Sequence, residues 1–180
     1  RDGMGGECGG YGLIWTRHMQ ELVEILAVYP EYTKHNLVAD YPKLKQAFIV
    51  ESRLNVLDGM MPNTGDSGAV GAWGRPGNAS TYLQAYKLYR DPRFATLAWR
   101  EHEAHGSSLR LDDDIYQEDP DALIREAQKI AQAEPSKLKS EHFGRYGQAY
   151  LQTEYPENGR AVFIHYGQGK GHSHHDCLNL

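Results

Sequence analysis

The sequence predicts an α+β protein in which the helices come first and the strands follow. Apolar residues recur at helical spacing through much of residues 1–136, and prolines end several of these periods. After Pro135 the pattern changes, and a run over 160–166 is rich in β-forming residues. Because strands and helices do not alternate, we expect two structural units that meet near Lys137, with a cleft between them as the place for a site.

Two helices are expected first, over residues 12–29 and 42–57. Pro30 supplies the stop of the first helix, Asp40 is the candidate N-cap of the second, and Pro42 lies in its first turn. The residues expected on the buried faces are Leu13, Ile14, Met19, Leu22, Val23, Ile25 and Leu26 in the first helix, and Leu44, Ala47, Phe48 and Leu54 in the second.

A long glycine-rich connection is expected over residues 58–77. Long connections without periodicity are often functional. Helices then resume over 80–89, 92–105 and 121–133, and Asn78 is the expected cap of the first of these three. The helical part of the chain therefore contains at least five helices before the strands begin.

Composition and charge exclude two classes of partner. The 180 residues are 40% hydrophobic, which suffices for a packed core, and carry a net charge of −5. Because there is no dense stripe of Lys and Arg, we expect no nucleic-acid partner. No apolar run approaches the roughly 20 residues that cross a bilayer, so we expect no membrane partner either. The sequence begins without methionine and ends in a strand-like pattern, so we expect it to be part of a longer polypeptide.

The segment after the expected strand 160–166 concentrates chemical groups. Three histidines and a carboxylate fall within residues 172–176, directly after a run that alternates glycine with Gln168 and Lys170. In an extended chain, alternate side chains share a face, which places His172 and His174 together. Neutral imidazoles bind metals and move protons near neutral pH.

A histidine-rich surface tract is the competing interpretation of this segment. A strand is expected immediately before it, and Cys177, Leu178 and Leu180 follow it in a pattern typical of a return to a sheet. Because a disordered tail is not framed in this way, we favour a site.

A second candidate cluster lies at the start of the sequence. Five glycines in residues 3–10 precede Tyr11 at the entrance of the first expected helix, and Glu7 lies among them. Glycine gives such a segment the freedom to position side chains at a site. A flexible linker that ends in an ordinary aromatic residue explains the segment equally well.

These segments resemble the heparinase II/III-like polysaccharide lyases and the related alginate lyases. The resemblance is carried by Asp2-Gly3 with Glu7 and Tyr11, by the loop over 61–67, and by the strand and histidine segment over 163–176. It implies the C-terminal part of an (α/α) toroid over residues 1–136, followed by the first strands of an antiparallel β-sandwich over 137–180. The expected order of helices and strands agrees with that architecture.

The resemblance also implies an activity, the β-elimination of a glycan that contains uronic acid. Tyr11 matches the family's base and acid, and His172 matches the histidine that assists it. The Asn or His that neutralises the substrate carboxylate in the family would precede Arg1. A tyrosine with a pKa of about 10 becomes a usable base only if nearby positive charge stabilises its phenolate, which His172 is able to provide.

Further residues are candidates for substrate or metal binding. Asn63, Arg75 and Lys170, together with Glu7, are expected to bind substrate hydroxyls or carboxylates, although ordinary surface positions explain the charged ones as well. Trp73 is expected either to stack on a sugar ring or to lie in the core.

The resemblance implies a structural zinc ion bound by His174. The companion Asp and His would follow Leu180, and a closed zinc site needs about four ligands, so the sequence holds part of the site at most. The family resemblance also implies a periplasmic or secreted protein.

Two other functions remain open. The first is a carbohydrate-binding protein of the same fold without catalysis, because fold alone does not guarantee activity. The second is a metal-dependent oxygenase of cupin type, suggested by the spacing of His172 and His174. A cupin requires a following glutamate and a small barrel without a helical half, so we rank it last.

Overall fold

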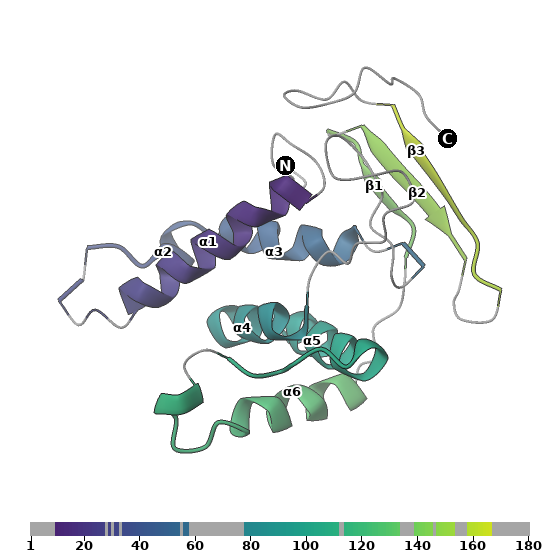
Figure 1. The fold of residues 1–180 in the computed structure, drawn as a ribbon. Coiled ribbons are helices and arrows are strands. Elements are labelled where there is room, and N and C mark those ends of the chain that lie inside the picture. Colours follow the sequence, from purple (N-terminus) through teal and green to yellow (C-terminus); the bar gives the residue numbers. More distant parts are fainter. Residues whose placement is uncertain are drawn as a thin grey trace. The chain divides into compact units, whose positions relative to one another are not determined.

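The computed structural model shows a protein of mixed helix and sheet, as the sequence predicts (Figure 1). Among the residues that the structure describes there are six α-helices, one short 3₁₀ helix and a three-stranded antiparallel sheet. The described residues are 10–27, 29, 31–32, 34–54, 56–57, 78–111, 114–133, 139–145, 147–153 and 158–166, and within them the side chains of 10–17, 27, 51 and 114 are not described.

The chain divides into two compact units. Unit 1 combines residues 1–76 with 138–180, and unit 2 comprises residues 77–137. In the described part of the chain, no helix combines the length and the apolar character that crossing a bilayer requires. The division into a toroid portion over 1–136 and the start of a sandwich over 137–180 stays a prediction.

The first described element of unit 1 is the helix α1 (Gly10–Ala27), which confirms the first expected helix. Its Val23 side chain is buried, and α1 contacts the later helix α3 (Leu44–Arg53). The expected burial of Leu22 and Ile25 is wrong, because these side chains are 42% and 60% exposed. The described contacts of α1 thus bury a narrower stripe than the apolar spacing predicts.

The second expected helix differs from the observed structure at both ends. Asp40 is not the N-cap of α3; it is the last residue of the four-residue helix α2 (Leu37–Asp40), whose N-cap is Asn36. The Asp40 carboxylate instead accepts a hydrogen bond from the Asn36 backbone N–H at 3.0 Å. At the other end, α3 stops at Arg53, because Val56 forms a β-bridge and Leu57 adopts a positive φ of 46°.

The strands of unit 1 are β1 (Glu141–Phe143), β2 (Gln148–Gln152) and β3 (Ala161–His165), in the spatial order β1-β2-β3. All neighbours are antiparallel, and the register places His142 beside Ala149 and Ala149 beside Ile164. The predicted strand over 160–166 is therefore confirmed as β3.

The two faces of this sheet differ in burial. Phe143 and Tyr150 lie on the inner face, where they form a core cluster with Val50, Leu54 and Val56 from α3 and the residues after it. The side chains that alternate with them point outward. On the outer face, Leu151 is 62% exposed, Val162 is 51% exposed and the residue after β3, Tyr166, is 42% exposed.

Unit 2 contains α4 (Ala79–Tyr89), α5 (Pro92–His105), the 3₁₀ helix η1 (Asp114–Tyr116) and α6 (Ala122–Ala133). These helices confirm the three predicted over 80–89, 92–105 and 121–133. Both α4 and α6 contact α5 (Figure 1).

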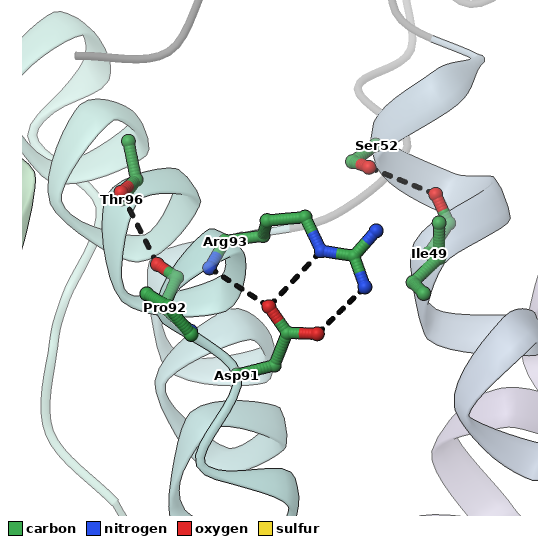
Figure 2. A network of polar contacts seen from close by, with 6 residues as sticks. All are labelled: Ile49, Ser52, Asp91, Pro92, Arg93 and Thr96. Atoms are coloured by element: carbon green, nitrogen blue, oxygen red, sulfur yellow. Dashed lines mark hydrogen bonds and ion pairs between the residues drawn. The ribbon is translucent and has the colours of Figure 1, made fainter. Parts of the chain in front are cut away.

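The N-terminus of α5 explains why this helix begins where the sequence predicts. Asp91 is the N-cap, and its carboxylate accepts hydrogen bonds from the Arg93 backbone N–H at 3.1 Å and from the Arg93 guanidinium at 3.0 and 2.6 Å (Figure 2). Pro92 follows in the first turn, where its missing N–H costs nothing. Thr96 donates to the Pro92 carbonyl one turn earlier.

Figure 2 also shows a local bond in α3, where the Ser52 hydroxyl donates to the Ile49 carbonyl at 2.8 Å near the end of that helix. Such a bond satisfies the side chain within its own helix. It belongs to unit 1 and contributes to the last turn of α3.

Candidate functional site

The predicted site residues fall almost entirely outside the described residues. Tyr11 is the exception in its backbone alone, because it lies in the first turn of α1. The positions outside the described residues are Glu7, Asn63, Trp73, Arg75, Lys170, His172 and His174. The structure therefore neither brings these residues together nor separates them, and their roles stay predictions.

The structure does describe the strand that leads to the histidine segment. His165, the last residue of β3, is 8% exposed, and the preceding alternate residue Phe163 packs against the core cluster of the inner face. Tyr166 follows with its side chain on the outer side of the sheet. The strand that precedes Gly167 in sequence therefore has one face packed against the core and one face exposed to solvent.

Tyr166 makes a polar contact on this outer face. Its hydroxyl oxygen lies 2.5 Å from Nε2 of His142, which belongs to β1. The two rings are stacked, with centroids 6.1 Å apart and planes inclined by 29°. We refer to these two residues as the His142–Tyr166 pair. It combines two titratable groups, and Tyr166 is the last described residue before the predicted histidine site.

The opposite face carries an ion pair that fixes β1 to α3. The Arg53 guanidinium donates to one oxygen of Glu141 from Nε at 3.0 Å and from Nη2 at 2.6 Å. The same guanidinium lies over the Phe143 ring, with Cζ 4.7 Å from the ring centroid. Both side chains are partly buried, at 28% and 22% exposure, and this charge-assisted contact holds the end of α3 against the sheet.

The tyrosines with shifted pKa values are unsuited to act as bases. Burial, with a contribution from the charge of Glu141, raises the pKa of Tyr150. Burial also raises the pKa of Tyr89 to about 12, and burial together with a hydrogen bond to Glu126 raises that of Tyr86. A proton acceptor requires the opposite shift, so these three phenols act as neutral packing and hydrogen-bonding groups.

The sequence analysis did not predict the contact between His142 and Tyr166. The two residues are separated by 24 positions, and the strand register that brings them together is not visible in hydrophobic periodicity. The available signal was the spacing of Gly144 and Gly147 around the turn after His142, since glycines leave room for a neighbouring ring.

A scan against protein-family models finds no match, and searches of the curated proteins and of the solved structures find none either. Among the residues that the structure describes, no group of three or more His, Cys, Asp or Glu side chains is arranged to hold a metal ion. His174 lies outside those residues, so the zinc site stays a prediction.

Proposed function

We propose that this chain is part of a polysaccharide lyase that cleaves a uronic-acid-containing glycan by β-elimination. The observation that carries the proposal is the sequence 163–176, in which a strand is followed directly by a glycine-rich run and a histidine cluster. The strand β3 supports it, because the strand predicted to precede the histidine cluster in sequence is present. In this proposal the helices form the C-terminal part of an (α/α) toroid and the strands open a β-sandwich.

The reaction requires a base, an acid and a group that neutralises the substrate carboxylate. The proton at C5 of a uronate is weakly acidic until its carboxylate is neutralised by donors or cations. Tyr11 as phenolate removes that proton, and the same phenol then returns a proton to the departing O4 on the same face of the sugar. His172 stabilises the phenolate or shares its proton. The electron pair of the broken C5–H bond forms the C4=C5 double bond as the C4–O4 bond breaks.

The remaining candidates fit substrate binding. Asn63, Arg75 and Lys170 offer donors to hydroxyls or carboxylates, Glu7 accepts from sugar hydroxyls, and Trp73 offers a flat face to a sugar ring. Such a substrate is an acidic polysaccharide or oligosaccharide.

Two further proposals follow from the resemblance. His174 is proposed as a ligand of a structural zinc ion, with its partners elsewhere in the full polypeptide. A periplasmic or secreted location fits an enzyme that degrades a glycan polymer.

The test is a product assay on the longest natural polypeptide that contains this sequence. Elimination produces an unsaturated uronate that absorbs in the near ultraviolet, so heparan sulfate, alginate and hyaluronan are screened for that signal. Tyr11→Phe is expected to lower kcat by about 100-fold or more, because general acid–base catalysis contributes on that order. Tyr29→Phe is the matched control, since Tyr29 is 61% exposed after the same helix.

Two results would overturn the proposal. Full activity in Tyr11→Phe removes the proposed base. Glycan binding by the wild-type protein without any ultraviolet signal on every uronate tested replaces the lyase with a carbohydrate-binding protein of the same fold.

A further inference from the structure

The His142–Tyr166 pair joins two strands that are not neighbours. The sheet order is β1-β2-β3, so β2 lies between the strand of His142 and the end of the strand before Tyr166 (Figure 1). The hydroxyl and Nε2 nevertheless approach to 2.5 Å. Side chains of two strands meet across the strand between them only if both are long and the side chains of the middle strand are small.

Small residues supply that space. Between the two rings, β2 and the turn before it present Gly147 and Ala149 to the outer face, while Gln148 is fully buried on the inner face. Gly144 gives room to the imidazole itself, because a Cβ at this position would lie only 3.2 Å from Cε1 of His142. The pair therefore depends on the space that three small residues, Gly144, Gly147 and Ala149, leave beside the two rings.

The backbone reinforces the same connection. The Tyr166 N–H donates to the Gly147 carbonyl at 2.7 Å, which extends the pairing of β3 with the β2 side by one residue beyond the strand. The Gly147 N–H in turn donates to the Phe143 carbonyl at 2.8 Å and closes the turn between β1 and β2. Gly147 has a φ of 83°, a conformation that other residues adopt at a cost.

We propose that the His142–Tyr166 pair is a positioning pair that anchors the end of β3 to β1 and so fixes where the segment with His172 begins. Its contribution to catalysis rests on the proposed lyase function, whereas the anchoring of β3 does not. The hydroxyl of Tyr166 donates to Nε2 or accepts from it, depending on which ring nitrogen of His142 carries the proton.

Amide hydrogen exchange of the Tyr166 N–H tests the anchor without any activity measurement. Tyr166→Phe removes the hydroxyl and keeps the ring, and His142→Leu removes the ring nitrogen that the hydroxyl contacts. Each is expected to accelerate exchange about 3- to 10-fold, the equilibrium factor of one hydrogen bond in local opening. The double variant is expected to show no further acceleration.

Three further variants make the test specific. His142→Gln keeps a polar atom near the position of Nε2, so exchange is expected within about twofold of the wild type. Gly144→Ala places a Cβ 3.2 Å from Cε1 of His142, which requires a small shift of the imidazole, and is expected to accelerate exchange less than His142→Leu does. Tyr29→Phe removes a hydroxyl from another exposed tyrosine of unit 1 and is expected to leave Tyr166 exchange unchanged.

Steady-state kinetics on the full natural polypeptide test the positioning role. Tyr166→Phe is expected to lower kcat on the order of 10-fold with KM within about twofold, because small misplacements of reacting groups reduce rate strongly. His142→Gln keeps a polar atom near the position of Nε2, so its kcat is expected to stay close to the wild-type value. The shape of the pH profile of kcat is expected to be unchanged in both variants.

The outcomes separate the two proposals. Wild-type exchange in Tyr166→Phe and in His142→Leu overturns the anchor, and accelerated exchange with unchanged kcat overturns its positioning role. If the wild-type protein eliminates no uronate, the lyase function and the catalytic role fail together, and the exchange rates still decide whether the pair anchors β3.

Discussion

Asn78 shows how one side chain determines where a helix begins. Its extended φ of −128° places it outside α4, and its Oδ1 accepts from the Thr81 N–H at 2.9 Å and from the Ser80 hydroxyl at 2.7 Å. The predicted cap is therefore confirmed. Such a bond satisfies a backbone donor that the first turn of a helix leaves without a partner.

Asn78→Ala is expected to lower the free energy of unfolding by about 1 kcal/mol, because the cap is lost while the backbone donor remains. Urea unfolding followed by circular dichroism measures the change. Asn78→Asp keeps an acceptor at the same place and is the control, expected to retain most of the stability. An equal loss of stability in both variants would show that the side-chain acceptor of residue 78 does not account for the stabilisation.

Tyr89 predicts a decrease in stability at alkaline pH. Burial raises its pKa in the folded protein from 10.0 to about 12, so the folded state holds the proton more tightly than the unfolded state. The stabilisation is complete below pH 10 and is lost as the pH rises toward 12. Unfolding midpoints measured from pH 8 to 12 are expected to fall less steeply for Tyr89→Phe than for the wild type. Parallel curves would contradict the assigned burial effect.

At the scale of elements, the Arg53–Glu141 ion pair joins a helix to a strand 88 residues later in the chain. The helix α3 and the strand β1 also share the core cluster around Phe143. This ion pair therefore lies beside an apolar cluster and is partly buried. Charge-assisted hydrogen bonds in such an environment are stronger than at the surface.

A double-mutant cycle of Arg53→Met and Glu141→Gln is expected to give a coupling energy of about 1–2 kcal/mol. The pair Arg90–Glu126 is the matched comparison, because its distance of 2.9 Å is similar while its side chains are 59% and 49% exposed. Its coupling is expected below about 0.5 kcal/mol. Equal coupling energies in the two cycles would rule out partial burial as the cause of the difference.

The elements that sequence predicted best are those determined by local groups. Asn78 and Asp91 cap α4 and α5 through bonds to residues two or three positions later, and both helices begin within one residue of the expected place. The prediction of a helix over 42–57 was wrong at the C-terminal end, where residues distant in sequence contact the chain. Gln152 of β2 accepts from the Leu57 N–H at 2.9 Å, a contact across 95 positions that takes this segment out of the helix.

At the scale of the whole molecule, the order of helices and strands was predictable because the hydrophobic period changes along the chain. The predicted site residues lie outside the described residues, apart from the backbone of Tyr11, so the candidate site stays a prediction. The His142–Tyr166 pair was not, since it arises from the register of three strands and from glycines that leave space between rings. Registers are set by non-local pairing, which a single sequence does not reveal.

The division into two compact units predicts that each unit depends on its own aromatic core. Phe143 is completely buried beside Tyr150 in unit 1, and Phe94 is 1% exposed beside Tyr89 in unit 2. Removing a buried phenyl ring costs about 3–5 kcal/mol, from lost burial and the cavity that remains.

Phe143→Ala is therefore expected to reduce hydrogen-exchange protection most in α3 and the sheet, and Phe94→Ala most in α4, α5 and α6. Phe→Leu at the same positions leaves a smaller cavity and is expected to cost less than half as much in each case. Exchange measured residue by residue distinguishes this pattern from a uniform loss of protection in both variants, which would mean that the whole chain opens as a single cooperative unit.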